Sequence, residues 1–234
     1  MKGERKILKR IVPELRLRYE RGMIFRGLLL SLLTLAFPPL SAIAGGQTIV
    51  ILGDSLTAGL GLSQEEAYPA RLEERLKAAG QSEVIVVNAG VSGDTTAGGL
   101  RRLAWVLRQK PSHLVVALGA NDMLRGLKPE ETEKNLTLLI EQIKKAGVSP
   151  VLFGMKATAN LGAEYRKRFD AIYPRVAQRE KIPLLPFLLE GVAMHAELNQ
   201  ADGIHPNSRG QEILAERTAK FLLPLLKKSA RPTQ

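Results

Sequence analysis

Three residues of this sequence have the types and spacing that nucleophilic catalysis by serine requires. Ser55 follows Gly53 and Asp54, and Asp202 lies three residues before His205. A serine hydroxyl is a weak nucleophile at neutral pH, so it needs a histidine base, and a carboxylate normally holds that histidine in the correct tautomer. In a turn, this spacing lets Asp202 reach one ring nitrogen of His205 while the other points at Ser55. The combination indicates acyl transfer through a covalent intermediate on Ser55.

An acyl-transfer site also needs fixed donors for the oxyanion that forms on the attacked carbonyl group. The candidates are the backbone N–H groups of Ser55 and Gly93 and the side-chain amide of Asn121. Glycine at position 93 lets the backbone come close to a substrate, because it carries no Cβ. We therefore expect an oxyanion hole formed by Ser55, Gly93 and Asn121.

Taken one at a time, these residues have simpler structural interpretations. A lone serine or an Asn-Asp pair often caps a helix or forms a turn, and Asp202-Gly203 is a common turn pair. Asp54 and Asp94 could be mistaken for an acid–base pair, but we expect them to bond the backbone and fix the loops. Only the complete set of residues favours a catalytic interpretation.

Short apolar runs alternate with longer amphipathic segments along the chain, which is typical of βα units and a parallel sheet. Strands are expected at residues 48–52, 83–88, 113–118, 150–153 and 182–185. Helices are expected at about 65–79, 95–109, 129–146, 164–180 and 208–226. Five such units predict an α/β fold, a three-layer α/β/α sandwich of the flavodoxin-like kind with a five-stranded parallel sheet whose strand order stays open.

Polar motifs lie where these strands end. In open parallel sheets, ligands bind beyond the carboxyl ends of the strands. The motifs at residues 53–56, 88–94 and 119–122 follow the first three strands, and the motif at 202–206 precedes the last helix. We therefore expect the four loops to meet in one site.

These four motifs resemble those of the SGNH, or GDSL, hydrolases, a family named for Ser, Gly, Asn and His. Ser55, Gly93, Asn121 and His205 fill the four positions, and Asp202 matches the acidic partner of the family's histidine. Within the family, the likeness is strongest to the bacterial periplasmic multifunctional group of acyl-CoA thioesterases, lysophospholipases and arylesterases. It extends over residues 53–62, 88–103, 119–128, 165–177 and 202–207.

The resemblance implies a serine esterase that hydrolyses small acyl esters, thioesters or lysophospholipids without a metal or another cofactor. It also implies that a loop at residues 123–128 covers the acyl chain, with Met123, Leu124 and Leu127 lining an apolar groove. Two alternatives remain: an acyltransferase or deacetylase that uses the same site on a sugar or lipid, and a non-catalytic binding or envelope protein. The intact Ser55, Asp202 and His205 argue against the non-catalytic alternative.

The formal net charge of +11 first suggests a nucleic-acid or membrane partner. Residues 1–44 contain nine Lys or Arg and three Glu, however, so the rest of the chain has a net charge of only +5. Aromatic residues are few and do not interleave with basic ones, so we expect no nucleic-acid binding. The absence of cysteine excludes a disulfide framework and thiol chemistry.

Residues 1–44 have the pattern of a secretory signal peptide: a basic segment, an apolar run and the cleavage motif Ala42-Ile43-Ala44. Pro38-Pro39 ends the apolar run well short of the about 20 residues of a membrane span, so cleavage is favoured over a permanent anchor. Residues 1–22 are a candidate mis-assigned extension, because Met23 begins an equally conventional signal. We expect a secreted or periplasmic monomer with a catalytic domain at 45–228 and a polar tail at 229–234.

Overall fold

The structure, a computed structural model, describes residues 46–229. The expected signal segment at 1–44 and residues 230–234 of the expected tail lie outside the described residues, whereas Ser229 ends the last helix. Within the described range, no helix combines the length and the apolar character needed to cross a membrane.

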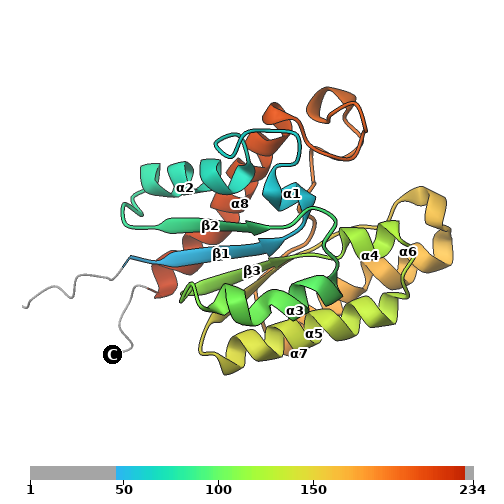
Figure 1. Cartoon of the computed structure of the whole chain (residues 1–234), viewed down its shortest axis with the longest axis horizontal. Coiled ribbons are helices and arrows are strands. Elements are labelled where there is room, and N and C mark those ends of the chain that lie inside the picture. The colour runs from blue at the N-terminus through green and yellow to red at the C-terminus, as the bar shows by residue number, and fades with distance from the viewer. Residues whose placement is uncertain (1–45, 230–234) are drawn as a thin grey trace, which may run out of the picture. The chain divides into compact units, whose positions relative to one another are not determined.

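Five parallel strands form one sheet in the order β2-β1-β3-β4-β5, as Figure 1 shows for its first three strands. The strands are β1 (Thr48–Gly53), β2 (Ile85–Gly90), β3 (His113–Ala117), β4 (Ser149–Phe153) and β5 (Leu184–Leu185). The apolar run of β1 is buried because helices cover the central strands on both faces. The expected α/β fold with a five-stranded parallel sheet is confirmed.

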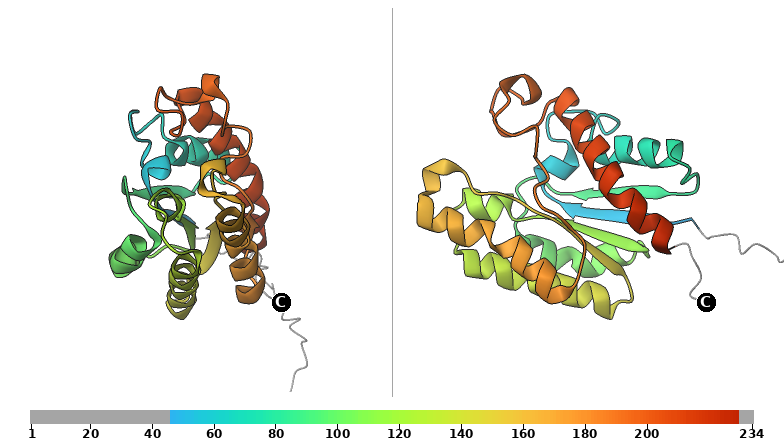
Figure 2. Two further views of the ribbon diagram at one scale, coloured as in Figure 1. Left: turned by 90° about the vertical axis from the view of Figure 1, so that its right-hand side faces the viewer. Right: turned by 180° about the vertical axis from the view of Figure 1, so that it is seen from behind.

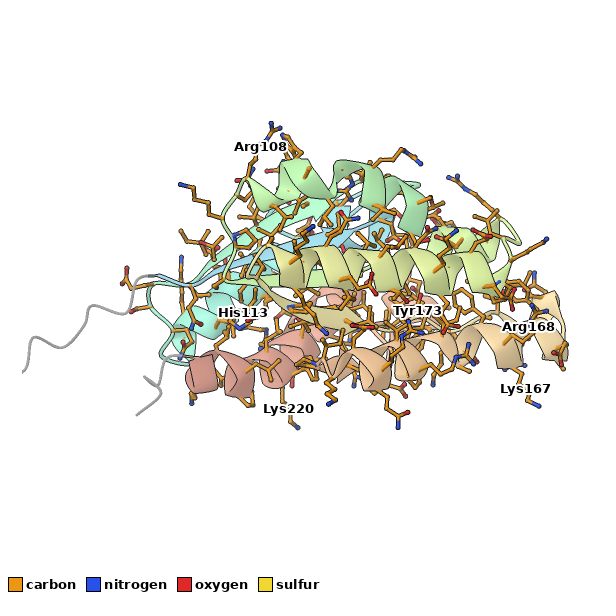
Figure 3. The ribbon with its side chains drawn as sticks, turned by 90° about the horizontal axis from the view of Figure 1, so that it is seen from below. Arg108, His113, Lys167, Arg168, Tyr173 and Lys220 are labelled. Carbon is orange, nitrogen blue, oxygen red and sulfur yellow. The ribbon has the colours of Figure 1, made fainter. Side chains whose placement is uncertain are left out.

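The helices form one layer on each face of this sheet. On one face, α2 (Tyr68–Ala78) packs against α8 (Ser208–Ser229), which crosses the sheet in the rear view of Figure 2. On the other face lie α3 (Thr96–Leu107), α5 (Pro129–Lys145) and α7 (Ile172–Glu180). In Figure 3 the α5 and α7 helices run side by side near Tyr173, whose buried hydroxyl donates to the carbonyl of Leu118 at 3.0 Å.

The strand register brings the loops of the site to one level. Gly53 at the end of β1 pairs with Gly90 of β2 on one side and Ala117 of β3 on the other. The chain leaves β1 for β2 and then crosses to β3 on the opposite side, so the strand order reverses at β1. Such a switch point leaves a crevice beyond the strand ends.

One expected helix, at 164–180, is two helices in the structure. The α6 helix (Ala163–Asp170) ends before Ala171, and α7 begins at Ile172. Pro174 explains the break, because it has no N–H to donate to the Asp170 carbonyl and its ring clashes with that group in a continuous helix. The expected strand at 182–185 is likewise shorter, since prolines precede and follow β5.

Candidate active site

Ser55 lies in the sharp turn that joins β1 to a short helix, α1 (Ser55–Ala58). Asp54 caps this helix through its Oδ1 atom, which accepts the N–H of Leu56 at 3.0 Å. The cap fixes the chain direction immediately beside the serine. Ser55 is 9% exposed, so its hydroxyl stands at the edge of the core.

His205 connects the serine with an acidic residue from the opposite end of the sequence. Its Nε2 atom is 2.9 Å from Oγ of Ser55, and its Nδ1 atom is 2.6 Å from Oδ2 of Asp202. The structure therefore brings together the three residues that the sequence selected for nucleophilic catalysis. The geometry matches the hydrogen-bond chain of a serine triad.

The turn that holds Asp202 organises itself locally. The second carboxylate oxygen of Asp202, Oδ1, accepts the backbone N–H groups of Ile204 and His205, each at 3.0 Å. These N–H groups and the ring of His205 lower the pKa of Asp202 from its ordinary 3.8 to about 2. The Asp202 carboxylate is therefore charged at neutral pH.

Gln200 anchors this turn to the loop after α1, a role that is not predictable from the sequence pattern. Its side-chain amide donates to the carbonyls of Leu60 at 2.7 Å and Pro206 at 3.1 Å, and its backbone N–H donates to the carbonyl of His205 at 2.7 Å. In the sequence, Gln200 looks like any other polar residue of a polar loop. Its anchoring role becomes visible only from its contact with Leu60 in the folded structure.

The candidate oxyanion donors follow β2 and β3. Gly93 adopts a positive φ of 79°, which favours glycine, and its carbonyl accepts the guanidinium of Arg125 at 2.6 Å. Asn121 lies in the short helix α4 (Ala120–Leu124), and its Nδ2 atom donates to the carbonyl of Asp94 at 3.0 Å. A second contact, to Oδ2 of Asp54, is long at 3.4 Å and therefore weak.

Asp122, the neighbour of Asn121, is a buried structural anchor whose role the sequence motif does not reveal. Its Oδ2 accepts the backbone N–H of Thr96 at 2.8 Å, and its Oδ1 accepts the hydroxyl groups of Thr96 and Thr132. These bonds fasten α4 to the first turn of α3. They satisfy a carboxylate that would otherwise be costly to bury.

The two aspartates that were expected to fix the loops do so in different ways. Asp54 bonds the backbone, as expected, and burial raises its pKa from 3.8 to about 6 despite the Leu56 N–H that it accepts. The carboxylate of Asp94 instead pairs with a side chain, accepting Nε of Arg102 at 2.7 Å.

The three residues expected in the acyl groove differ in exposure. Leu124 and Leu127 are 50% and 40% exposed on and after α4. The Met123 side chain is instead buried in the core, with its sulfur 3.7 Å from the Thr158 hydroxyl. Leu124 and Leu127 therefore present the exposed apolar surface of the segment at 123–128, whereas Met123 packs in the core.

Known proteins are similar to this chain in sequence and in fold. The profile of the GDSL-like Lipase/Acylhydrolase family matches residues 51–213. The chain is 43% identical over 184 residues to "Thioesterase 1/protease 1/lysophospholipase L1" of Escherichia coli K12, covering 78% of this chain and 86% of that protein. It is 42% identical over 193 residues to "Esterase TesA" of Pseudomonas aeruginosa, covering 82% and 96%.

A solved structure agrees with these sequence matches. A crystal structure of TesA superimposes with a TM-score of 0.73 at 41% identity, covering 76% of this chain and 99% of that one. The residues that the family profile matches, 51–213, include all four loops that carry the candidate residues. This chain belongs to the GDSL-like lipase/acylhydrolase family, the SGNH hydrolases.

Proposed function

We propose that this protein is a serine esterase that hydrolyses carboxylic esters and thioesters through an acyl intermediate on Ser55. The observation that carries the proposal is the chain of two hydrogen bonds from Ser55 through His205 to Asp202, at 2.9 and 2.6 Å. The family relationship supports the same reaction class.

In the first step, Nε2 of His205 takes the proton of the Ser55 hydroxyl as Oγ attacks the carbonyl carbon of the substrate. The imidazolium that forms is stabilised by the charged Asp202. His205 then gives the proton to the departing alcohol or thiol, and the acyl group stays on Ser55. Water repeats the sequence in the second step and releases the acid.

The oxyanion of each tetrahedral intermediate is bound by the backbone N–H groups of Ser55 and Gly93 and by the Asn121 amide. Of the two contacts that Nδ2 of Asn121 makes, the long one to Asp54 is the weaker. The N–H hydrogen of Asn121 that faces Asp54 can therefore bond the oxyanion instead at little cost. The bond to the Asp94 carbonyl meanwhile keeps the amide in place.

The exposed leucines Leu124 and Leu127 offer an apolar surface for the acyl chain next to Asn121. The names of the relatives include thioesterase, lysophospholipase and esterase. We infer that the substrates of this chain are small acyl esters, thioesters or lysophospholipids.

We infer hydrolysis rather than transfer to a sugar or lipid, because the named relatives are a thioesterase/lysophospholipase and an esterase. The triad is complete within one chain, which is consistent with an active monomer. The signal-like pattern of residues 1–44 supports export to the periplasm or beyond.

A substrate panel of p-nitrophenyl esters, acyl-CoA and lysophospholipid tests the proposal. Wild type should hydrolyse members of the panel, and Ser55→Ala should lose the activity while keeping its circular-dichroism spectrum. Ser92→Ala removes an exposed hydroxyl from the loop after β2 and serves as the matched control. Equal activity of wild type and Ser55→Ala would refute the mechanism, and acyl esters of an added alcohol as the main product would indicate transfer.

A further inference from the structure

The side chain of Arg102 ties together the strand ends that carry the site. This residue of α3 is largely buried, and its guanidinium donates three hydrogen bonds. They go to Oδ2 of Asp94 at 2.7 Å, to the carbonyl of Ala89 at 2.7 Å and to the carbonyl of Gly53 at 2.9 Å. Gly53 is the last residue of β1, and Ala89 is the residue before the last in β2. Arg102 therefore connects the ends of both strands with Asp94 in the loop after β2.

Asp94 extends this connection to the proposed oxyanion hole. Its carboxylate accepts Arg102, and its backbone carbonyl accepts Nδ2 of Asn121 at 3.0 Å. Its own N–H is bonded to the carbonyl of Val91 at 3.0 Å, which closes the turn that contains Gly93. The Asn121 amide, the candidate donor that follows β3, therefore depends directly on the position of Asp94.

Gly98 shows how closely the carboxylate of Asp94 is fitted. A Cβ atom at position 98 would lie 1.7 Å from Oδ1 of Asp94, so a larger residue would displace the carboxylate. Arg102 binds Oδ2 of Asp94, and the missing side chain of Gly98 leaves room for Oδ1.

We propose that Arg102 and Asp94 are a pair of positioning residues that hold the Asn121 amide where the oxyanion forms. This inference rests on the proposed function. Neither side chain bonds Ser55 or His205, so the pair acts on the reaction through the Asn121 amide. Arginine suits the task because its planar fork reaches three acceptors at once, which a lysine ammonium on a flexible stem does not reproduce.

Arg102→Gln tests the pair, with Arg101→Gln as its control. Arg101 precedes Arg102 on α3 and is exposed, so both variants lose the same charge from the same helix. With p-nitrophenyl butyrate, Arg102→Gln should lower kcat about 10- to 100-fold and leave KM nearly unchanged, since a misplaced donor mainly weakens transition-state binding. The Ki of butylboronic acid, which forms a tetrahedral adduct on serine, should rise by a similar factor. Arg101→Gln should leave all three constants near the wild-type values.

A double-mutant cycle separates positioning from general loss of structure. If Arg102 acts through Asn121, adding Arg102→Gln to Asn121→Ala should cost little more than Asn121→Ala alone. An equal loss in both backgrounds overturns the inference, as does a wild-type kcat for Arg102→Gln. Should Arg102→Gln fail to fold, Asp94→Asn, which keeps the size of the side chain, carries the same expectation and the same refutation.

The cycle also separates this inference from the proposed function. Full activity of Ser55→Ala refutes the esterase mechanism itself, and full activity of Asn121→Ala refutes the oxyanion role and the positioning pair together. An impaired Asn121→Ala beside a fully active Arg102→Gln refutes the positioning pair alone.

Discussion

Replacing Asp54 with asparagine should change how the stability of this protein depends on pH. The Asp54 carboxyl is completely buried, and this burial raises its pKa from 3.8 to about 6. The Leu56 N–H and the charge on His205 oppose the rise in the Asp54 pKa, whereas the charge on Asp94 adds to it. Asparagine keeps the shape of the side chain and the oxygen that caps α1, but it cannot ionise.

The sign of the effect follows from proton binding. Between pH 4 and pH 6 the unfolded chain has lost the Asp54 proton while the folded protein still holds it, so folding takes up a proton. Stability from this group therefore falls as the pH rises through that window. The two pKa values differ by about 2 pH units, which corresponds to about 3 kcal/mol at about 1.4 kcal/mol per unit.

Urea unfolding of wild type and Asp54→Asn at several pH values measures this contribution. The free energy of unfolding of the variant, relative to wild type, should increase by about 2 kcal/mol between pH 4 and pH 7, because the unfolded chain has already lost part of the Asp54 proton at pH 4. Asp202→Asn is the control with a pH dependence of opposite sign, because the pKa of Asp202 is lowered to about 2. Ionised Asp202 stabilises the fold above about pH 4, and this stabilisation is lost as the pH falls toward 2. A difference between Asp54→Asn and wild type that stays constant from pH 4 to pH 7 would show that Asp54 titrates normally.

Three further changes test the site and the sheet. Asn121→Ala should lower kcat about 10²- to 10³-fold in steady-state assays, since it removes one oxyanion donor; an unchanged kcat would contradict that role. Leu127→Asp should reduce hydrolysis of long-chain p-nitrophenyl esters more than that of short-chain ones, and an unchanged chain-length profile would argue against an acyl surface there. Glu73→Ala should increase light scattering on incubation, because Glu73 accepts the outward N–H of Val86 on the edge strand β2 at 2.7 Å; the exposed neighbour variant Glu74→Ala should scatter like wild type.

The sequence predicts most of the fold because burial on both faces leaves a plain signal in the central strands. The run at 48–52 is apolar throughout, and β1 is found there. Strand order does not follow from such runs, because β1, β3 and β4 are equally apolar and their pairing depends on how the helices pack. The break between α6 and α7 at Ala171 is predictable from the sequence, because Pro174 lies inside the expected helix.

The sequence predicts some residues of the site and misses others, because only some of them carry a specific motif. The motif at the end of β1 identifies Ser55, and the spacing of Asp202 and His205 before α8 identifies the histidine. The burial of Met123 beside the exposed Leu124 is not predictable from α4, since a helix of five residues is too short to show an apolar face. Arg101 and Arg102 are adjacent and alike, yet helical phase separates them: position 102 lies three residues after Gly99 and four before Val106, both buried.

The two halves of the site therefore depend on different parts of the fold. Asp202 and His205 are fixed within one turn, so their mutual geometry survives small movements of the sheet. The Asn121 amide instead relies on acceptors that are 27 and 67 residues away, at Asp94 and Asp54, and so on the relative positions of β1, β2 and β3. Packing changes that shift these strands will disturb the oxyanion side first, because the bonds of Arg102 and Asn121 cross between strands while those of the Asp202 turn do not.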